Sequence, residues 1–363
     1  MTRAPILIMA GGTGGHVFPG LAVANVLRER SQPVVWLGTR RGIEARLVPA
    51  AGIEIEWISI GGLRGSGLAG WIAAPVRLLV ALVQALGVLH RRRPSAVLGL
   101  GGFVSGPGGV AAWLSRRPLL IHEQNAVAGT TNRWLARFAD RVFEAFPGSF
   151  PASVASQLVG NPVRQDILDM PTPAERFRER PMDAPLRLLV IGGSQGARVL
   201  NRTLPEALAL LPPEQRPLVW HQGGITHAEA EERYRSRQLE VRLEPFIVDM
   251  AAAYDWADLV LCRAGALTLA ELAAAGLGAV LVPFPHAIDD HQVRNAAHLC
   301  DAGAAVMISE AELAPARLAA ELTRLSADRS AVRRMADAAR TQAHPDAAKA
   351  IANACLQLTE AEA

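Results

Sequence analysis

The chain has 363 residues, half of them apolar and 20% charged, a composition that indicates a folded protein with a core large enough for two domains. Lys349 is the single lysine, so a Walker-type phosphate loop is excluded and a Schiff-base lysine is disfavoured. Residues 1–163 hold 16 arginines against 7 acids, a formal +9, whereas the remainder is formally −6, so only the first half suits an anionic surface.

The first half alternates short runs of Val, Ile and Leu with helical patterns. Continuous apolar runs separated by helices are typical of parallel strands that are covered on both faces. The strands expected here are Ile6–Met9, Val34–Leu37, Ile55–Ile58, Val97–Gly99, Leu119–His122 and Arg141–Phe143.

One long apolar stretch, residues 68–90, interrupts this series. Pro75 suits the first turn of a helix, so we expect a helix over 75–90 of roughly 24 Å, short of the ~20 apolar residues that a membrane span needs. Two interpretations remain open: a core-packing helix with a solvated basic end, or a helix partly sunk in the membrane interface with arginines on lipid phosphates. The residues that would make this contact are Ile72, Val76, Leu79, Leu82, Val83, Arg91, Arg92 and Arg93.

The second half repeats the architecture after a break near residues 160–163. Strands are expected at Leu186–Ile191, Leu218–His221, Leu259–Cys262, Val280–Val282 and Ala305–Ile308. Two successive series predict two Rossmann-like, doubly wound domains, residues 1–162 and 163–343.

Each half opens with a strand, a glycine-rich turn and a helix. The turns are residues 11–16 (GGTGGH) and 192–197 (GGSQGA). Backbone N–H groups at a helix N-terminus favour anions, and glycine lets a phosphate or sugar approach the backbone. Neither turn reads G-x-G-x-x-G, and no acid ends the second strand (Trp36-Leu37-Gly38-Thr39), which disfavours a dinucleotide oxidoreductase.

Further motifs follow in order along the chain. They are residues 61–65 (GGLRG), 101–107 (GGFVSGP), 122–125 (HEQN), 160–164 (GNPVR), 262–268 (CRAGALT) with Glu271, and 290–292 (DHQ) with Asn295. With the two glycine turns, this series resembles the MurG family of bacterial peptidoglycan glycosyltransferases, from about residue 5 to about 345. The segment 284–292 differs from the family pattern by one residue.

The resemblance implies a GT-B fold, in which two doubly wound domains face a central cleft that holds the active site. It also implies that a C-terminal helix, within about 344–363, packs back on the first domain. The family transfers N-acetylglucosamine (GlcNAc) from UDP-GlcNAc, with inversion, to the 4-hydroxyl of N-acetylmuramic acid (MurNAc) in undecaprenyl-pyrophosphoryl-MurNAc-pentapeptide, converting lipid I into lipid II. Inverting displacement needs a base and leaving-group stabilisation but no enzyme nucleophile, in keeping with the lack of a nucleophile motif.

The resemblance also implies residue roles. His16 is a candidate general base, or a ligand of the acceptor pyrophosphate, or simply a hydrogen-bonding residue. Asn125 and Arg164 either contact the donor or pin the hinge. Ser194 matches the α-phosphate ligand, and Ile247 matches a main-chain contact to uracil. Glu271 would accept the ribose hydroxyls, and Gln292 those of the sugar. The remaining UDP-GlcNAc positions are Thr13, Gly14, Gly15, Ala266, Leu267, Thr268, Leu269 and Ala270.

No metal or other cofactor is expected, because Asp289-Asp290 lacks further spaced ligands and a GT-B site can hold pyrophosphate with helix N–H groups. Three cysteines far apart, Cys262 among them as a buried strand residue, favour a reducing compartment. We expect no cleaved leader, because Ile6–Ala10 is short and runs into glycines.

The expected partners are UDP-GlcNAc, lipid I, an anionic membrane surface at the cytoplasmic face of the inner membrane, and proteins of cell-wall synthesis and division. Nucleic acid is not expected, for lack of a basic patch interleaved with aromatics. The alternatives are another glycolipid glycosyltransferase, a UDP-GlcNAc 2-epimerase, and a non-catalytic UDP-sugar-binding scaffold.

Overall fold

The computed structural model describes residues 3–61, 67–178, 180, 184–193, 197–285 and 290–361, with the backbone alone for 67–73 and 360–361. The chain forms two compact units. Unit 1 comprises Met1–Arg164 and His344–Ala363, and unit 2 comprises Gln165–Ala343. The first unit thus ends two residues beyond the boundary expected from the sequence.

Unit 1 is built on a parallel sheet with the order β3-β2-β1-β4-β5-β6-β7. The chain runs outward from β1 in one direction and, from β4 onward, in the other, which is the doubly wound topology expected from the apolar runs. The strands are β1 Ile6–Met9, β2 Val34–Gly38, β3 Glu54–Trp57, β4 Ala96–Gly99, β5 Leu119–Glu123, β6 Arg141–Glu144 and β7 Ser156–Leu158.

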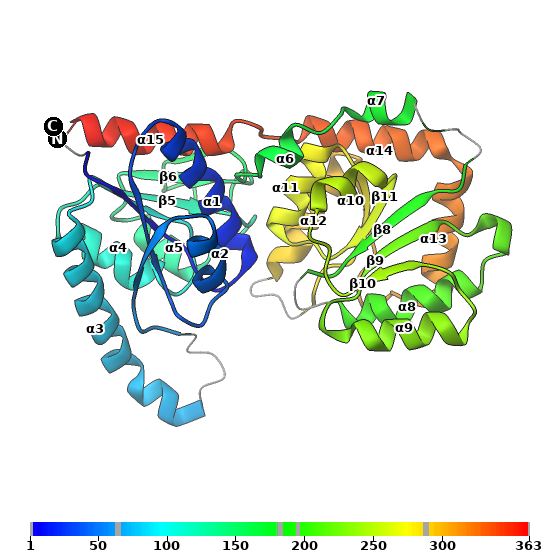
Figure 1. Ribbon diagram of the computed structural model, residues 1–363, viewed down its shortest axis with the longest axis horizontal. Helices are drawn as coiled ribbons and strands as arrows, with labels where there is room; N and C mark the ends of the chain where they lie inside the picture. The colour runs from blue at the N-terminus through cyan, green and yellow to red at the C-terminus, as the bar shows by residue number, and fades with distance from the viewer. Residues whose placement is uncertain are drawn as a thin grey trace. The chain divides into compact units, whose positions relative to one another are not determined.

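Helices cover both faces of this sheet (Figure 1). Side chains alternate along a strand, so Ile6 and Ile8 pack toward one face with α1 and α15, whereas Leu7 and Met9 pack toward the other with α3 and α4. The helices are α1 Gly14–Glu29, α2 Glu44–Ala50, α3 Gly67–Arg92, α4 Ser105–Leu114, α5 Thr130–Leu135 and α15 Ala347–Ala361.

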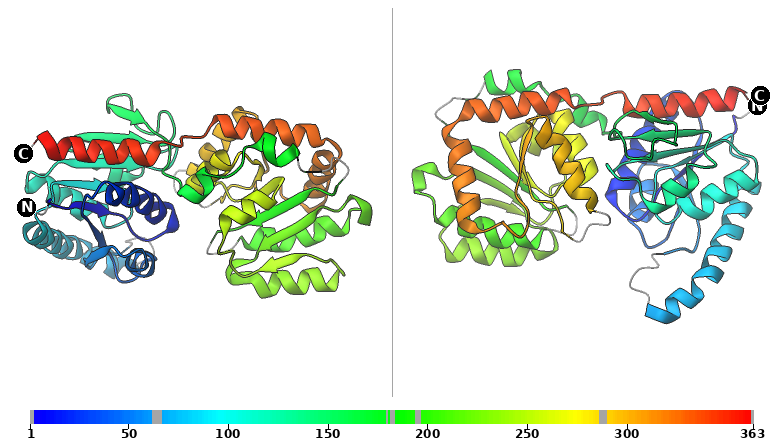
Figure 2. Two further views of the ribbon diagram at one scale, coloured as in Figure 1. Left: turned by 45° about the horizontal axis from the view of Figure 1, so that its top comes forward. Right: turned by 180° about the vertical axis from the view of Figure 1, so that it is seen from behind.

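The C-terminal helix belongs to unit 1, although it is separated in sequence from the rest of that unit by all of unit 2. Helix α15 packs against α1 and β4, and its residues Ala348, Ile351, Ala352 and Cys355 lie in the same core cluster as Leu27. Figure 2 shows α15, drawn in red, along the outside of the unit.

Unit 2 contains a second parallel sheet with the order β10-β9-β8-β11-β12-β13. Helices α8, α9 and α13 cover one face through Leu200, Tyr234 and Leu318, and Leu189 and Val260, which alternate with that face, are also fully buried. The strands are β8 Arg187–Ile191, β9 Leu218–Gln222, β10 Arg242–Glu244, β11 Leu259–Cys262, β12 Gly278–Leu281 and β13 Ala305–Met307.

The helices of unit 2 lie before the first of these strands, between them and after the last. The α-helices are α6 Gln165–Leu168, α7 Pro173–Arg178, α8 Arg198–Ala209, α9 His227–Ser236, α10 Met250–Trp256, α11 Ala266–Ala275, α12 His291–Asp301, α13 Pro315–Ala327 and α14 Arg329–Thr341. Two 3₁₀ turns are η1 Pro213–Gln215 and η2 Gly224–Thr226.

Two expectations about elements are wrong. Strands β7 and β10 were missed, because both are three-residue strands at the sheet ends with polar, partly exposed residues. The helix expected from Pro75 begins at Gly67, with Pro75 inside it. Pro75 is exposed, and a proline inside a helix leaves one carbonyl of the preceding turn without its helical partner.

Helix α3 is therefore also longer than expected. Within the described residues, Ala74–Arg92 meets the requirements of a membrane span by length and composition alone, with 19 residues, a mean hydropathy of 1.3 and 28% of it buried. Ala81, Ala85 and Val88 of this helix lie in the core of unit 1. A core-packing helix passes the same test, so the observation does not place α3 across a membrane.

Candidate active site

The candidate site of unit 1 lies where the strand order reverses, between β1 and β4. In doubly wound sheets, ligands bind beyond the carboxyl ends of the strands at this point. The loop after β1 carries residues 11–16, and the loop after β4 carries residues 100–104. Two of the motifs singled out in the first half of the sequence thus meet at one edge of the sheet, whereas residues 62–65 of the GGLRG motif lie outside the described residues.

The two loops are in close contact. Gly102 has a φ of +80°, and a Cβ added to it would lie 2.4 Å from the Gly11 carbonyl oxygen. Ser105, fully buried at the start of α4, donates from Oγ to the Gly101 carbonyl (2.8 Å) and accepts from the Gly101 N–H (3.1 Å), and Oγ also lies 3.3 Å from the Met9 carbonyl oxygen. Glycine is required at position 102 because a side chain would separate the loops.

His16 stands in the first turn of α1, above this junction. Its ring lies against Gly101, since a Cβ there would lie 2.9 Å from Nε2, and Nδ1 lies 3.4 Å from Thr13 Oγ1. Burial lowers the pKa of His16 from its ordinary value of 6.5, against the opposing effects of Glu123, a hydrogen bond to the Gly11 carbonyl, and Glu44. The imidazole is therefore mainly neutral at pH 7, the form that can accept a proton.

Glu44 is a buried carboxylate beneath the first glycine loop, and the sequence analysis missed it. Its Oε1 accepts from the backbone N–H (2.9 Å) and the hydroxyl (2.7 Å) of Thr39, and its Oε2 accepts from the Gly12 N–H (2.9 Å). The side chain is fully buried, and a Cβ on Gly11 would lie 2.7 Å from Oε1. Glu44 thus ties the end of β2 to the loop that carries His16.

Glu123, at the end of β5, is a second buried carboxylate. Oε1 accepts from the backbone and side-chain N–H groups of Asn125 at 3.0 and 3.1 Å, and Oε2 accepts from the Gly129 N–H and Asn132 Nδ2 at 3.1 and 2.9 Å. Four donors satisfy both oxygens, which makes burial of a carboxylate tolerable. Glu123 fixes Asn125 at the edge of the site.

The HEQN and GNPVR motifs are joined by hydrogen bonds. His122 donates from Nε2 to the Gly160 carbonyl (2.9 Å) and accepts at Nδ1 from Gln124 Nε2 (3.1 Å), while Asn161 donates to the Gln124 carbonyl (3.0 Å). Burial lowers the pKa of His122 to about 4, which keeps it neutral. Gln124 Oε1 is left as a buried acceptor with no hydrogen-bond partner in the described part of the chain, next to the glycine that contacts His16.

Arg164 closes the GNPVR motif at the last residue of the first segment of unit 1. Its guanidinium carbon lies 5.7 Å from the centroid of the Phe18 ring, on the helix that carries His16. Thr13 is exposed, and Gly14 and Gly15 are half-buried at the start of α1. These predicted positions all lie around the same loop of unit 1.

In unit 2 the strand order reverses between β8 and β11. The second glycine loop follows β8, and α11 follows β11. Ser194, predicted as a phosphate ligand, lies outside the described residues. Gly193 has a φ of +72°, and no atom of the described residues lies within 4 Å of an added Cβ.

The start of α11 provides backbone donors at the same edge. Gly265 is the N-cap, and Ala266, Leu267 and Thr268 form the first turn, where the N–H groups of a helix N-terminus favour an anion. Leu269 is buried, and its N–H donates to the Gly265 carbonyl (3.0 Å). Within the predicted run Ala266–Glu271, Leu269 therefore supports the helix.

Glu271, one turn further on and beside Ala270, is oriented by a residue that the sequence analysis missed. Tyr254, fully buried on α10, donates its hydroxyl to Glu271 Oε2 at 2.9 Å. A carboxylate held in one rotamer can present its other oxygen to a diol without a further ordering cost. Tyr254 is identified only by this hydrogen bond in the structure, because no sequence motif places a tyrosine 17 residues before the glutamate.

Two other residues predicted to contact UDP-GlcNAc each use one polar group in a hydrogen bond within the protein. The Ile247 N–H donates to Gln222 Oε1 (3.1 Å), and the Ile247 side chain is buried, which leaves its carbonyl as the group that could meet a base. Gln292 Oε1 accepts from the Phe284 N–H (2.9 Å), which leaves the side-chain amide N–H groups for a ligand. Within the described residues there is no group of three metal-ligating side chains.

Comparisons with known proteins agree with this architecture. A family model described as the glycosyltransferase family 28 N-terminal domain matches residues 6–144, and the corresponding C-terminal domain model matches residues 187–351. Two curated relatives, from Nitrosococcus oceani and Alkalilimnicola ehrlichii, are 60% and 59% identical over 354 residues, which is 97% of this chain and 98% of each relative. Both are named UDP-N-acetylglucosamine–N-acetylmuramyl-(pentapeptide) pyrophosphoryl-undecaprenol N-acetylglucosamine transferase.

Solved structures show the same fold. The MurG of Acinetobacter baumannii is 41% identical, with a TM-score of 0.83 over 98% of this chain and all of that one. A UDP-GlcNAc 2-epimerase from Neisseria meningitidis has a TM-score of 0.66 over 97% of this chain and 99% of its own, at 12% identity, so that likeness concerns the fold alone. The GT-B fold class expected from the sequence is confirmed.

Proposed function

The chain belongs to glycosyltransferase family 28, and we propose that it transfers GlcNAc from UDP-GlcNAc to the 4-hydroxyl of MurNAc in undecaprenyl-pyrophosphoryl-MurNAc-pentapeptide. This step converts lipid I into lipid II in peptidoglycan biosynthesis. The observation that carries the proposal is near-full-length identity of 59–60% to transferases named for this reaction. The geometry of the two units supplies a matching set of chemical groups.

His16 is the proposed base. Its imidazole is mainly neutral at pH 7 because burial lowers its pKa, and it stands at the switch point of unit 1. In the reaction the acceptor O4 loses its proton to His16 and forms a bond to C1 of GlcNAc. The bond from C1 to the β-phosphate oxygen breaks, and UDP leaves with that electron pair. Attack from the opposite side of C1 inverts its configuration.

The donor groups belong to unit 2. The first turn of α11 offers backbone N–H groups and a positive helix end to the pyrophosphate, which stabilises the charge that develops on departing UDP. Glu271, fixed by Tyr254, accepts hydrogen bonds from the ribose hydroxyls. Gln292 donates from its amide to the sugar, while Ser194 and the Ile247 carbonyl complete the nucleotide contacts that the family pattern implies.

The acceptor is lipid-linked, and α3 supports a peripheral contact with the cytoplasmic face of the plasma membrane. The exposed fractions of Val76, Leu79 and Val83, which lie on one helical face, are 65%, 60% and 60%. Such a stripe on a helix beside basic residues is typical of interfacial binding. Leu82 instead packs against the core of unit 1, and the side chain of Ile72 lies outside the described residues.

The basic end of α3 divides into two groups. Arg91 pairs with Glu56 (2.9 Å), and Arg92 pairs with both Glu54 and Glu56, so these two predicted lipid contacts are ion-paired within unit 1. Arg93 is exposed and remains a candidate for lipid phosphate. Recruitment of cell-wall synthesis and division proteins is proposed on family grounds only.

The test of the reaction is release of UDP from UDP-GlcNAc, with and without a lipid I analogue, with the disaccharide product identified by mass. We expect release only with the acceptor, and His16→Ala to lower kcat by about 10²–10⁴. Acceptor-independent release of free sugar, or exchange of a sugar proton with solvent, would support the epimerase. Donor binding without turnover would support the scaffold.

The membrane contact has its own test. Leu79→Glu should reduce binding to vesicles of phosphatidylglycerol and phosphatidylcholine by at least tenfold. Leu210→Glu is a matched control in unit 2, because Leu210 is also 60% exposed. Equal binding by the two variants would exclude the α3 face as the membrane contact and leave the transferase proposal unaffected.

A further inference from the structure

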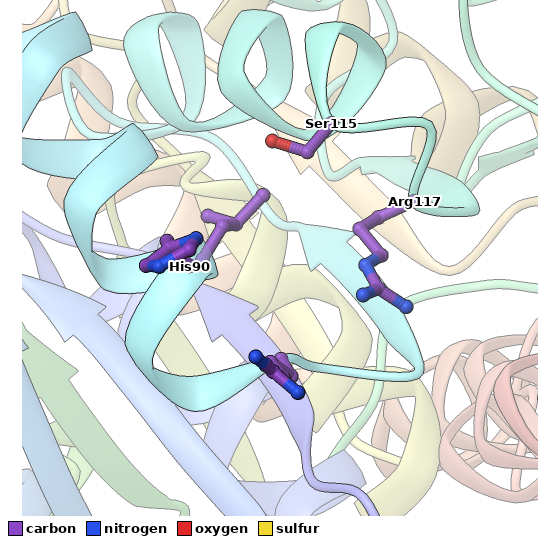
Figure 3. Close-up of a pocket in the computed structure, with 5 residues that line it drawn as sticks. His90, Ser115 and Arg117 are labelled. Atoms are coloured by element: carbon purple, nitrogen blue, oxygen red, sulfur yellow. The ribbon is translucent and has the colours of Figure 1, made fainter.

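A basic hollow lies at the C-terminal ends of α3 and α4. It has a volume of about 200 Å³ and is lined by Leu89, His90 and Arg93 from the end of α3 and by Ser115 and Arg117, which follow α4. Figure 3 shows the side chains of His90, Ser115 and Arg117 arranged around this space. The lining therefore combines two guanidinium groups, an imidazole and a hydroxyl, and includes no acid.

The polar side chains of the hollow have no partners of their own. Among the described residues, those of His90, Arg93, Ser115 and Arg117 take part in no hydrogen bond and no ion pair. The adjacent Arg91 and Arg92 differ, because Glu54 and Glu56 neutralise them. Two uncompensated arginines beside one space repel each other, and an anion between them would remove that repulsion.

Capping of the helix ends does not account for these residues. Cations are common at helix C-termini, because each end carries roughly half a negative charge. In the described structure, however, neither Arg93 nor Arg117 donates to a carbonyl of α3 or α4. Two helix ends contribute about −1 in total against the +2 of the arginines, so the hollow keeps a net positive charge.

The backbone at both helix ends is strained in the same way. Arg93 has a φ of +44° and Arg116 a φ of +51°, in the left-handed region where a helix end usually carries glycine. A residue with a Cβ is disfavoured in this conformation, so each of the two positions carries conformational strain. A proline comes directly after Arg93 in the first turn and directly after Arg117 in the second. The two turns deliver one arginine each to the same hollow.

The hollow lies at one end of the exposed apolar stripe of α3. Val76, Val83 and His90 are spaced by seven residues, which places them on one helical face. A helix that rests on a membrane through Val76 and Val83 would thus bring His90 and its neighbouring arginines to the level of the lipid headgroups.

We propose that this hollow binds the phosphate of an anionic lipid headgroup. Arginine forks and a serine hydroxyl are donors that match phosphate oxygens. The volume is below the roughly 300–1,000 Å³ of pockets for drug-sized ligands, so it suits a headgroup phosphate rather than a nucleotide sugar. The proposal rests on the membrane contact proposed for α3 and adds a discrete headgroup site to it.

The first experiment compares two arginines in the same turn. Arg117 lines the hollow, whereas Arg116 does not, and Arg→Gln removes one charge at either position. A basic residue near an anionic surface contributes about fivefold to partitioning wherever it lies. With vesicles of 30% phosphatidylglycerol in phosphatidylcholine, we expect Arg116→Gln to lose at most fivefold, Arg117→Gln at least tenfold, and Arg93→Gln with Arg117→Gln about a hundredfold. Equal losses at 116 and 117 would overturn the proposal.

The second experiment distinguishes the lipid from free phosphate, which shares its chemistry. Thermal unfolding is followed with inorganic phosphate and with chloride at matched ionic strength, for the unmodified protein and for Arg117→Gln. A site specific for lipid predicts an Arg117-dependent difference on vesicles and little stabilisation by millimolar phosphate. Arg117-dependent stabilisation by phosphate without a difference on vesicles would overturn the lipid assignment.

Transfer to a water-soluble lipid I analogue serves as the folding control. Arg117 lies outside the groups assigned to the reaction, so Arg117→Gln should keep kcat within about twofold while losing vesicle binding. Loss of transfer by the unmodified protein would instead count against the proposed reaction. Failure of Leu79→Glu to alter vesicle binding, with Arg117→Gln still active and defective on vesicles, would retain the hollow and exclude the apolar stripe.

Discussion

The contact between the two glycine loops of unit 1 makes Gly102→Ala the sharpest test of the proposed site. A Cβ at this position would lie 2.4 Å from the Gly11 carbonyl oxygen and 3.2 Å from the Gly11 N and C atoms. Cβ atoms essentially never approach another heavy atom within 3.0 Å, so the Gly11 carbonyl must move from 2.4 Å to at least 3.0 Å. That carbonyl accepts the hydrogen bond from His16.

The expected cost has two parts. Gly102 has a φ of +80°, and a left-handed conformation costs an L-residue about 1–2 kcal/mol. Overpacking of a well-packed contact adds about 1–3 kcal/mol. We therefore expect the free energy of unfolding to fall by about 2–5 kcal/mol. A 1 Å misplacement of a catalytic group can cost about a hundredfold, so a shift of this size should lower kcat/KM by about ten- to a hundredfold.

Substitutions at two nearby glycines distinguish the cost of conformational strain from the cost of overpacking. Gly12 also has a positive φ, +92°, but no atom of the described residues lies within 4 Å of an added Cβ, so Gly12→Ala reports conformational strain alone. Gly106 lies in α4, and an added Cβ would meet only Thr131 Cγ2 at 3.7 Å, so Gly106→Ala should be neutral or stabilising.

The measurements are urea unfolding and kcat/KM for a soluble acceptor analogue. If Gly102→Ala keeps kcat/KM within twofold and loses no more stability than Gly12→Ala, the loop contact does not position His16 and the reasoning is wrong.

Two further predictions concern buried groups that support the proposed site. Glu44→Gln should move the acid limb of the kcat/KM–pH profile to lower pH, because the Glu44 carboxylate raises the pKa of His16 and its loss leaves the effect of burial less opposed. It should also cost about 1.5–3 kcal/mol of stability for the lost charged hydrogen bonds, and an acid limb that stays in place would contradict this role. Tyr254→Phe should raise the KM for UDP-GlcNAc about two- to tenfold with kcat nearly unchanged, because Glu271 must then be ordered on binding. A fall in kcat with constant KM would assign Tyr254 a different role.

The sequence predicted the strands well wherever both faces of the sheet are buried. Runs such as Leu188–Ile191 are apolar at every position because helices cover both sheet faces, so the parallel strands were predictable. Strand β10 carries Arg242 and Glu244 on either side of Leu243 and pairs only with β9, so it offered no such pattern. The start of α3 was misplaced because proline is common in a first helical turn but is also tolerated at an exposed interior position.

The position of the candidate site was predictable where it depends on local sequence. Glycine loops and helix starts lie in one short segment, and these motifs come together as expected at the edges of the two sheets. Glu44 and Tyr254 act through Gly12 and Glu271, which are 32 and 17 residues away, so no local spacing marks them. One signal was available for Glu44: it is an acid in the first turn of the helix that follows β2.

The direction in which the pKa of His16 shifts could not be predicted from the sequence, because it depends on burial and on the carboxylates nearby. Burial alone would favour the neutral imidazole, and two buried carboxylates, Glu123 and Glu44, act in the opposite direction. The outcome is a lowered pKa, which suits the role of base that we propose for His16. In the proposed mechanism, the imidazolium would form in the field of both carboxylates, which are already fixed by backbone donors and need no reorganisation. On that proposal, the residues that hold the loop in place also stabilise the charge that proton transfer would create.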